Sequence, residues 1–101
     1  MKKLSLAVVA AALVLAPQAY ADEALAKAKN CRTCHVDDKK LIGPAYKEVA
    51  AKYKGDPNAV KMLAEKMRKG GTGVWGKVPM PPNPLVNEQE AETLAKWVLS
   101  K

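Results

Sequence analysis

The sequence predicts an all-α fold of four or so short helices. Four segments either are rich in helix-forming residues or repeat apolar residues at helical spacing, and glycines or prolines separate most of them. No alternation of apolar and polar residues is long enough to indicate a strand, and no internal repeat is present. A chain of 101 residues is long enough for one domain at most.

The N-terminus has the features of a Sec-type secretory signal. Lysines at positions 2 and 3 precede an apolar run of 13 residues over 4–16, and Ala19-Tyr20-Ala21 has the small-x-small pattern of a cleavage site. An uncleaved membrane anchor is the alternative, but a span needs about 20 apolar residues. We therefore expect residues 1–21 to be a signal peptide, and residues 22–101 to form one periplasmic domain with no membrane span.

The mature chain is expected to be basic. Without Lys2 and Lys3, 15 basic residues remain against 10 acidic ones, a net charge of +5. A basic charge often indicates nucleic acid or acidic lipid as a partner. Export argues against nucleic acid, and no basic amphipathic stretch with large apolar residues points to lipid. The lysines therefore keep the surface soluble or steer the protein toward acidic protein partners, and both roles are compatible.

The first two helices are expected over residues 22–30 and around 46–53. Residues 22–30 are rich in helix formers, carry acidic residues at the positively polarised N-terminal end, and run directly into Cys31. Gly43-Pro44 then interrupts the chain. The residues after it that fall at i, i+3, i+4 and i+7, and so define one helical face, are Tyr46, Val49, Ala50 and Tyr53.

The third helix is expected to begin with Asp56 as N-cap and Pro57 as its first residue. It should run to about Lys69, because Gly70 and Gly71 stop it. The residues on its apolar face are Val60, Leu63, Ala64 and Met67.

A constrained loop and the last helix complete the prediction. Residues 72–86 lack a helical period and contain four prolines, which predicts an extended loop. The last helix should start at Asn87, with Glu90 three residues on to form a capping box. Its apolar stripe consists of Ala91, Leu94, Ala95, Val98 and Leu99.

The hydrophobic core of this domain is expected to be thin. Phenylalanine is absent, and the aromatic residues after position 21 are Tyr46, Tyr53, Trp75 and Trp97. A domain of this size is near the limit at which a core alone is stable. A large apolar cofactor inside the fold would supply what the side chains lack.

The strongest chemical signal is the segment Cys31-Arg32-Thr33-Cys34-His35. C-x-x-C-H is typical of c-type haem attachment, because two thiols at this spacing add to the vinyl groups on one porphyrin edge and the histidine then lies beneath the iron. A disulfide would close a very small loop, a thioredoxin-like site expects a βαβ context, and a zinc site needs four ligands. We therefore expect one covalent haem c, held by Cys31 and Cys34, with His35 as an axial ligand.

The sixth iron ligand is expected to be Met80. His35 is the only histidine, and methionine is its partner in many cytochromes c. Met67 lies on the apolar face of a predicted helix, where a methionine fills the core, and Met62 falls on the polar side, where it should face solvent. Met80 lies outside any helix, between prolines that restrict the backbone. A lysine is the alternative ligand.

A closed, six-coordinate iron indicates a one-electron carrier and not an enzyme. A haem peroxidase or a gas sensor would need an open sixth position and a polar distal group, and no second histidine is available for that role. The other alternative is a structural or binding module in which the cysteine pair forms only a disulfide.

Four further motifs lie along the mature chain: Gly43-Pro44-Ala45-Tyr46, Gly73-Val74-Trp75-Gly76, Val78-Pro79-Met80-Pro81-Pro82-Asn83 and Leu94-Ala95-Lys96-Trp97-Val98-Leu99. Together they resemble the small bacterial class I cytochromes c of the c-551 and c-552 type, over the whole mature chain. The resemblance implies the class I cytochrome c fold around one haem c. It also implies a monomeric carrier that serves respiratory partners such as a reductase, an oxidase or a nitrite reductase.

The resemblance also implies roles for three further residues. The Pro44 carbonyl would accept the His35 Nδ1 hydrogen, the Trp75 indole would reach a haem propionate, and Asn83 would hydrogen-bond near the sulfur of the methionine ligand. The plainer interpretations are that Pro44 and Asn83 only form turns and that Trp75 only fills the core. The first and last helices would cross through residues such as Leu25, Leu94 and Val98. Lys77 departs from the usual pattern, and its charge would slightly disfavour oxidised iron.

Overall fold

The computed structural model describes residues 18–101, so most of the predicted signal peptide (1–17) lies outside the described residues. The elements in chain order are α2 (Gln18–Ala28), the short 3₁₀ helix η1 (Cys31–Thr33), α3 (Tyr46–Lys52), α4 (Ala59–Lys69) and α5 (Glu88–Leu99). Within residues 18–101 there are no strands, so the predicted all-α class is confirmed. None of these helices is long and apolar enough to cross a membrane.

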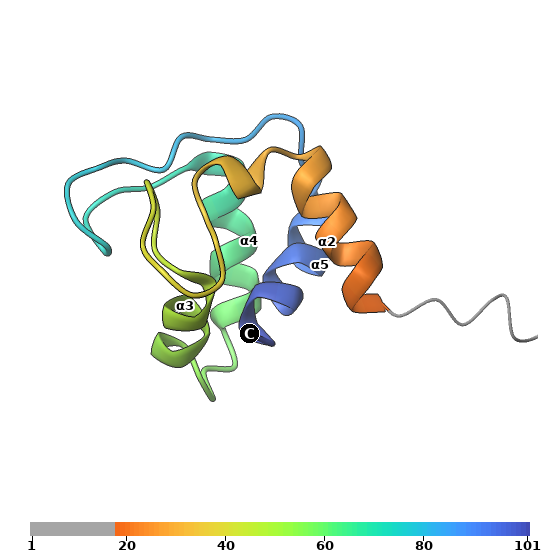
Figure 1. The fold of residues 1–101 in the computed structure, drawn as a ribbon, viewed down its shortest axis with the longest axis horizontal. Coiled ribbons are helices and arrows are strands. Elements are labelled where there is room, and N and C mark those ends of the chain that lie inside the picture. Colours follow the sequence, from red (N-terminus) through yellow and green to blue (C-terminus); the bar gives the residue numbers. More distant parts are fainter. Residues whose placement is uncertain (1–17) are drawn as a thin grey trace, which may run out of the picture.

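Helix α5 is the centre of the fold. It packs against α2, α3 and α4, and Figure 1 shows it between α2 and α4. Its predicted apolar stripe is buried at Ala91, Leu94, Ala95 and Val98, whereas Leu99 is only partly buried. Trp97 is buried as well, although it lies outside the predicted stripe. The crossing of the first and last helices is confirmed, with Ala26 fully buried and Leu25 packed against the same core.

Helix α2 differs from its predicted limits of 22–30. It begins at Gln18 and ends at Ala28. The earlier start is physically reasonable because residues 18–21 include no helix breaker, and the Gln18 side-chain amide donates to the Asp22 carboxylate one turn later at 3.0 Å. The earlier end follows from Asn30, whose φ of 65° is left-handed and cannot continue a right-handed helix. Cleavage after Ala21 stays a prediction.

Helix α3 matches its predicted position, but the start of α4 does not. Asp56 and Pro57 precede α4, which begins at Ala59 with Asn58 as its N-cap. The Asp56 carboxylate accepts the Asn58 N–H at 2.8 Å, and the Ala59 N–H bonds to the Asp56 carbonyl at 3.3 Å. Asp56 therefore caps a turn that leads into the helix, because its side chain satisfies a donor two residues on.

The predicted end of α4 and beginning of α5 are confirmed. Gly70 takes a φ of 77°, and its N–H bonds to the Lys66 carbonyl at 2.8 Å. Asn87 forms the predicted capping box: its side chain accepts the Glu90 N–H at 2.8 Å, and the Glu90 carboxylate accepts the Asn87 N–H at 3.1 Å. Both ends are determined by groups within four residues, which explains why the sequence predicted them.

Met62 does not simply face solvent, as its polar flank suggested. It is partly buried and packs against the central core, as do Val60, Ala64 and Met67. Because the side chain precedes Leu63 on α4 and is long and flexible, it can bend toward the core from the edge of the apolar face.

The capping box generates a stability prediction. Replacing Asn87 with Ala should lower the free energy of unfolding by about 1 kcal/mol, because the Glu90 N–H loses its acceptor. The matched control is Asn58→Ala, since Asn58 is also an N-cap residue but its side chain makes no capping hydrogen bond. Chemical denaturation measures both. Equal losses in the two variants would contradict the assignment.

Candidate functional site

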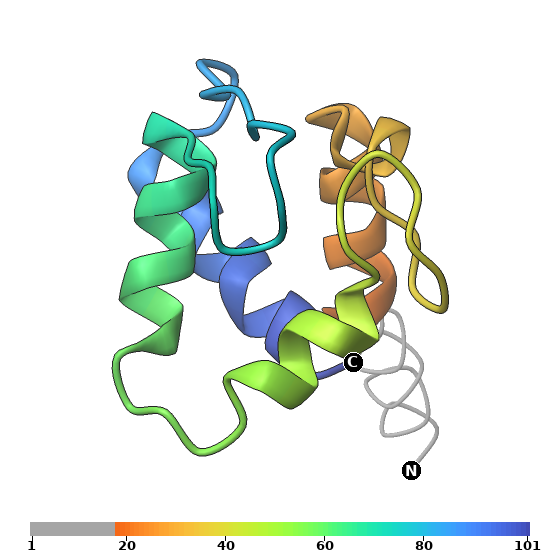
Figure 2. The same cartoon turned by 90° about the vertical axis from the view of Figure 1, so that its left-hand side faces the viewer.

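One cavity of about 800 Å³ lies between two long loops. In Figure 2 the loop that precedes α3 stands on the side of α2, and the loop between α4 and α5 stands on the side of α4. Residues of both loops line the cavity, and most of its lining surface is apolar. The structure places Cys31, Cys34, His35 and Pro44 on one wall, and Trp75, Met80 and Asn83 come from the other loop. All seven residues predicted from the sequence are therefore brought to one cavity.

The C-x-x-C-H segment is a tight turn that follows α2. Asn30 enters it in the left-handed conformation, and Cys31–Thr33 form the 3₁₀ helix. The Cys31 carbonyl then accepts the N–H groups of Cys34 and His35 at 3.3 and 3.1 Å. This turn brings two partly buried free thiols and one imidazole to the same cavity. Burial raises the pKa of the Cys31 thiol.

His35 is held by a segment of four residues, 43–46. Its Nδ1 lies 2.9 Å from the Pro44 carbonyl oxygen, and its ring stacks on Tyr46 with 5.0 Å between centroids and 17° between planes. A Cβ at Gly43 would lie 2.4 Å from His35 Cε1, so only glycine allows this approach. Because a carbonyl only accepts, Nδ1 carries the hydrogen in this pair and Nε2 keeps its lone pair.

The surroundings of His35 favour the neutral imidazole that a metal ligand requires. Burial lowers the pKa of the imidazole, and the nearby Arg32 charge lowers it further, while the hydrogen bond to Pro44 opposes the shift. A neutral imidazole is the form that binds a metal. The His35 ring is therefore oriented by Pro44, and its burial favours the neutral form.

Met80 is positioned through its backbone. Its N–H donates to the Gly71 carbonyl at 2.7 Å, and its carbonyl accepts the Gly71 N–H at 3.0 Å, which makes an isolated antiparallel bridge. A Cβ at Gly70 would lie 2.6 Å from the Met80 carbonyl oxygen, so the neighbouring glycine also permits this close pairing. The side chain of Met80 is free to face the cavity that it lines.

Asn83 joins the loop between α4 and α5 to the chain that follows α2. Its side-chain amide donates to the Lys29 carbonyl at 2.8 Å, and its side-chain oxygen accepts the Leu85 N–H at 3.1 Å. Among the described residues no hydrogen bond joins Asn83 to the Met80 sulfur. The amide ties the loop to the chain just before Cys31, beyond the end of α2, where backbone carbonyls lack a partner within the helix.

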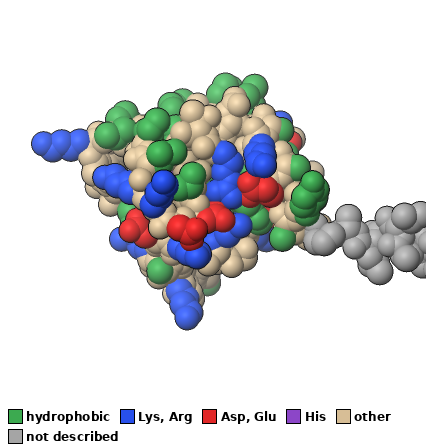
Figure 3. Space-filling view, in the orientation of Figure 1, with side chains coloured by type: hydrophobic (Ala, Val, Ile, Leu, Met, Phe, Trp, Pro, Cys, Tyr) green, Lys and Arg blue, Asp and Glu red, His purple; other side chains and the backbone are tan. Residues whose placement is uncertain are grey.

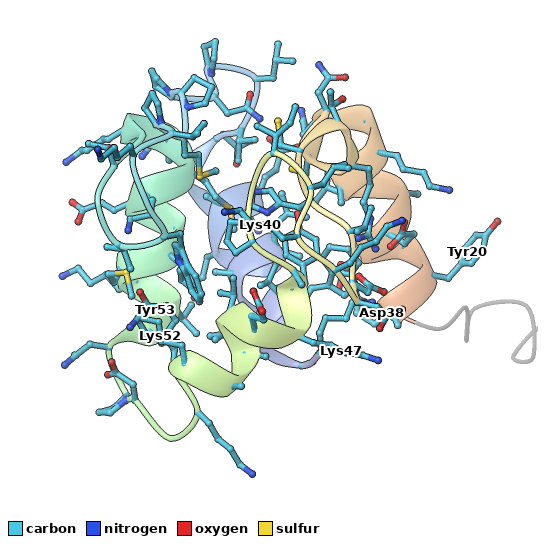
Figure 4. All side chains as sticks on the ribbon, turned by 60° about the vertical axis from the view of Figure 1, so that its left-hand side comes forward. Tyr20, Asp38, Lys40, Lys47, Lys52 and Tyr53 are labelled. Carbon is cyan, nitrogen blue, oxygen red and sulfur yellow. The ribbon has the colours of Figure 1, made fainter. Side chains whose placement is uncertain are left out.

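Trp75 is partly buried on the cavity wall. Its outer side lies near α3, where Lys52 Nζ is 5.7 Å from the Trp75 ring centroid and 5.8 Å from that of Tyr53. Figure 4 labels Lys52 and Tyr53 at this side of the molecule. The indole therefore has a cation on one side and the cavity on the other.

Two site residues, Gly43 and Tyr46, were missed as such by the sequence analysis. Gly43 was interpreted as a chain break and Tyr46 as part of a helical face. Both contact His35 directly. The only available signal was their position on either side of Pro44, which does not by itself show that this segment folds onto residue 35.

The fold and the cavity together define a class of protein. A small all-α domain surrounds one apolar cavity that has two thiols, an imidazole and a thioether among its lining groups. Such a domain is suited to holding one large prosthetic group by covalent bonds and metal ligands. The chain belongs to the cytochrome c family, whose sequence profile matches residues 23–101. Its relatives among the cytochromes c-551 and c-552 carry one covalently bound haem c and are electron carriers.

Individual relatives agree with this assignment. The chain is 50% identical to cytochrome c-551 of Pseudomonas aeruginosa over 98 residues, which cover 95% of this chain and 93% of that one. It is 54% identical to cytochrome c-552 of Hydrogenobacter thermophilus over 86 residues, 85% and 87% of the two chains. The crystal structure of Nitrosomonas europaea cytochrome c552 superposes with a TM-score of 0.75 at 46% identity, covering 77% and 96%. The expected class I cytochrome c fold is thus confirmed.

The contact between Gly43 and His35 generates the second prediction. Gly43→Ala should lower the free energy of unfolding by about 1–3 kcal/mol, because the new methyl group would overlap the imidazole ring. Gly71→Ala is the control: its Cβ would meet only the flexible end of Lys66, at 3.2 Å, so the change should stay within about 0.5 kcal/mol. Denaturant titration measures both changes, and equal losses in the two variants would contradict tight packing of Gly43 on His35.

Proposed function

We propose that the chain is an exported, periplasmic protein that carries one electron at a time between respiratory redox proteins. Its haem c would be attached through Cys31 and Cys34, with His35 and Met80 as axial iron ligands. The observation that carries the proposal is that the C-x-x-C-H segment and Met80, which are far apart in the chain, line the same cavity of about 800 Å³.

The residues present fit a haem c. The cavity of about 800 Å³ falls in the range of about 300–1,000 Å³ that is usual for ligand sites, and its lining is mainly apolar. The two cysteines and His35, whose Nε2 is left free by the contact of Nδ1 with Pro44, line the same space. When bound, the haem iron would supply reversible exchange of one electron between the ferrous and ferric states. The protein's part is to hold the group and to exclude other ligands.

Met80 is favoured over the other methionines after residue 21. Met62 is not among the residues that line the cavity. Met67 lines it, but Met67 also lies within α4 and packs against the core. Only Met80 combines a place on the wall with a backbone fixed outside any helix, so its side chain is available.

A closed iron supports a carrier instead of an enzyme. With His35 and Met80 both bound, no position would remain for a substrate or a gas, and the chain has no second histidine to act as a distal group. The ligation would also link residues 35 and 80 into a loop of 45 residues, which restricts the unfolded chain and stabilises the folded one.

Electron exchange would take place at the mouth of the cavity. Apolar side chains are exposed there, namely Ile42, Val74, Val78 and Leu85. Figure 3 shows hydrophobic side chains along the edge formed by the loops, with charged side chains over the rest of this face. Lys40 and Lys77 also line the cavity. A rim of this kind would dock an acidic partner, such as a reductase, oxidase or nitrite reductase, at a rate that falls with salt.

Pro44 and Trp75 would support the haem. The Pro44 carbonyl holds the His35 ring in the tautomer that leaves Nε2 free. The Trp75 indole would donate to a propionate at the wall where it lies. Asn83 would hydrogen-bond near the Met80 sulfur, and its amide also ties the Met80 loop to the carbonyl of Lys29.

Removing the proposed sulfur ligand tests the assignment. Met80→Ala should open the iron to added ligands and lower the reduction potential by on the order of 0.1 V or more, within the roughly 0.8 V that axial ligation spans. The oxidised protein should also lose the weak long-wavelength charge-transfer band of sulfur-to-iron ligation. Visible spectra and redox titration measure these changes. Met62→Ala and Met67→Ala are the controls, and if either shows the effect while Met80→Ala does not, the ligand is misassigned.

The mass of the exported protein tests attachment and cleavage together. Protein isolated from the periplasm should begin at Asp22 and exceed the polypeptide mass by one haem, because thioether bonds survive denaturation. A mass two hydrogens lower than the polypeptide would instead show a disulfide between Cys31 and Cys34. A mass that includes residues 1–21 would refute the predicted cleavage.

A further inference from the structure

Arg32, a spacer residue in the C-x-x-C-H motif, has an unusually complete set of partners. Its Nε and Nη2 donate to the two carboxylate oxygens of Glu23 on α2, the first at 3.0 Å. Its Nη1 donates to Asp37 at 2.8 Å. Only 20% of the Arg32 side chain is exposed to solvent, so it is far more enclosed than an ordinary surface arginine. A forked arginine–carboxylate pair is geometrically specific as well as strong.

Two aromatic rings complete the surroundings of the guanidinium. Arg32 Cζ lies 5.1 Å from the centroid of Tyr46 on α3 and 5.0 Å from that of Trp97 on α5. These rings contact each other edge to face at 5.5 Å. Lys101 closes the cluster, with its Nζ 4.5 Å from the Trp97 centroid and 3.4 Å from Asp37. The guanidinium therefore joins α2, α3 and α5 to the C-x-x-C-H residues 31–35, which we call the attachment segment.

The cluster also reaches the proposed iron ligand. Tyr46 lies against Arg32 and stacks on the His35 ring. A displacement of Arg32 would therefore move the ring on which the imidazole rests. The charges are consistent with a stable cluster, because the hydrogen bond from Arg32 lowers the pKa of the Glu23 carboxyl.

We propose that Arg32 is a positioning residue that fixes the attachment segment on the α2–α3–α5 core and sets the orientation of the His35 ring through Tyr46. This rests on the proposed haem site but adds a residue that neither thiol nor iron chemistry requires. The spacing of the motif needs some residue between the cysteines, and only the forked, planar guanidinium satisfies two carboxylates and two rings at once.

The test compares Arg32→Met with Arg32→Lys and Lys47→Met in the haem-loaded protein. Lys47 is the matched control, because its 2.6 Å pair with Asp38 is exposed and removal of the lysine changes the net charge equally. Figure 4 labels both members of that pair. Arg32→Met should lower the folding equilibrium constant at least tenfold and change the EPR g values of the oxidised protein, which respond to the imidazole plane. Arg32→Lys should rescue neither, whereas Lys47→Met should change the constant less than threefold and leave the g values unaltered.

Several outcomes would overturn the proposal. If Arg32→Met lowers the folding equilibrium constant no more than Lys47→Met does, Arg32 does not stabilise the fold. If the g values of Arg32→Met are unaltered, Arg32 does not orient the His35 ring. If Arg32→Lys restores both quantities fully, the charge alone matters and the forked geometry does not. If Arg32→Met does not fold, Glu23→Gln breaks the same fork while Asp37 and both rings remain, and it should weaken folding more than Lys47→Met does. The mass of the wild-type protein tests the haem separately, so failure of the proposed function is distinguishable from failure of this inference.

Discussion

The packing of α5 against three other helices determines where the site can form. Helix α2 leads into the C-x-x-C-H turn, α3 follows the segment that holds His35, and α4 leads into the loop that contains Met80. Because α5 contacts all three, it sets the spacing of the cavity walls. Small and branched side chains such as Ala95 and Leu94 are almost fully buried there, which lets the helices approach closely.

The two walls of the cavity are held by different forces. His35 is fixed by side-chain packing: glycine on one face, the Tyr46 ring by stacking, and the Pro44 carbonyl at Nδ1. Met80 is fixed by backbone hydrogen bonds to Gly71 and by the prolines beside it. A proline-restricted backbone suits the proposed role of Met80 as a ligand, because binding to iron would then require little ordering of the chain.

The contacts of the enclosed Arg32 side chain hold the C-x-x-C-H turn in place although the hydrophobic core is thin. The chain has no phenylalanine, so few large side chains are available to hold the attachment segment. A guanidinium with two carboxylates and two rings provides directional contacts in their place. Their value depends on enclosure, since an exposed ion pair contributes little to stability.

The sequence by itself determined the features that depend on near neighbours. The capping box of Asn87, the stop at Gly70 and the apolar stripe of α5 all act over a few residues; the first two were found as predicted, and the stripe is buried except at Leu99. Where a local pattern was ambiguous the prediction failed, as for the start of α4, because Asp56 is able to cap a turn as well as a helix.

Only the tertiary structure decided which distant groups meet. Asn83 bonds to a carbonyl 54 residues away in the chain, and Met62 packs against a core to which α2, α3 and α5 contribute as well as its own helix. Arg32 finds partners on α2, α3 and α5, which no spacing within the motif could reveal. The physical reason is the same in each case: a side chain's partner depends on how the helices pack, and that packing is a property of the whole chain.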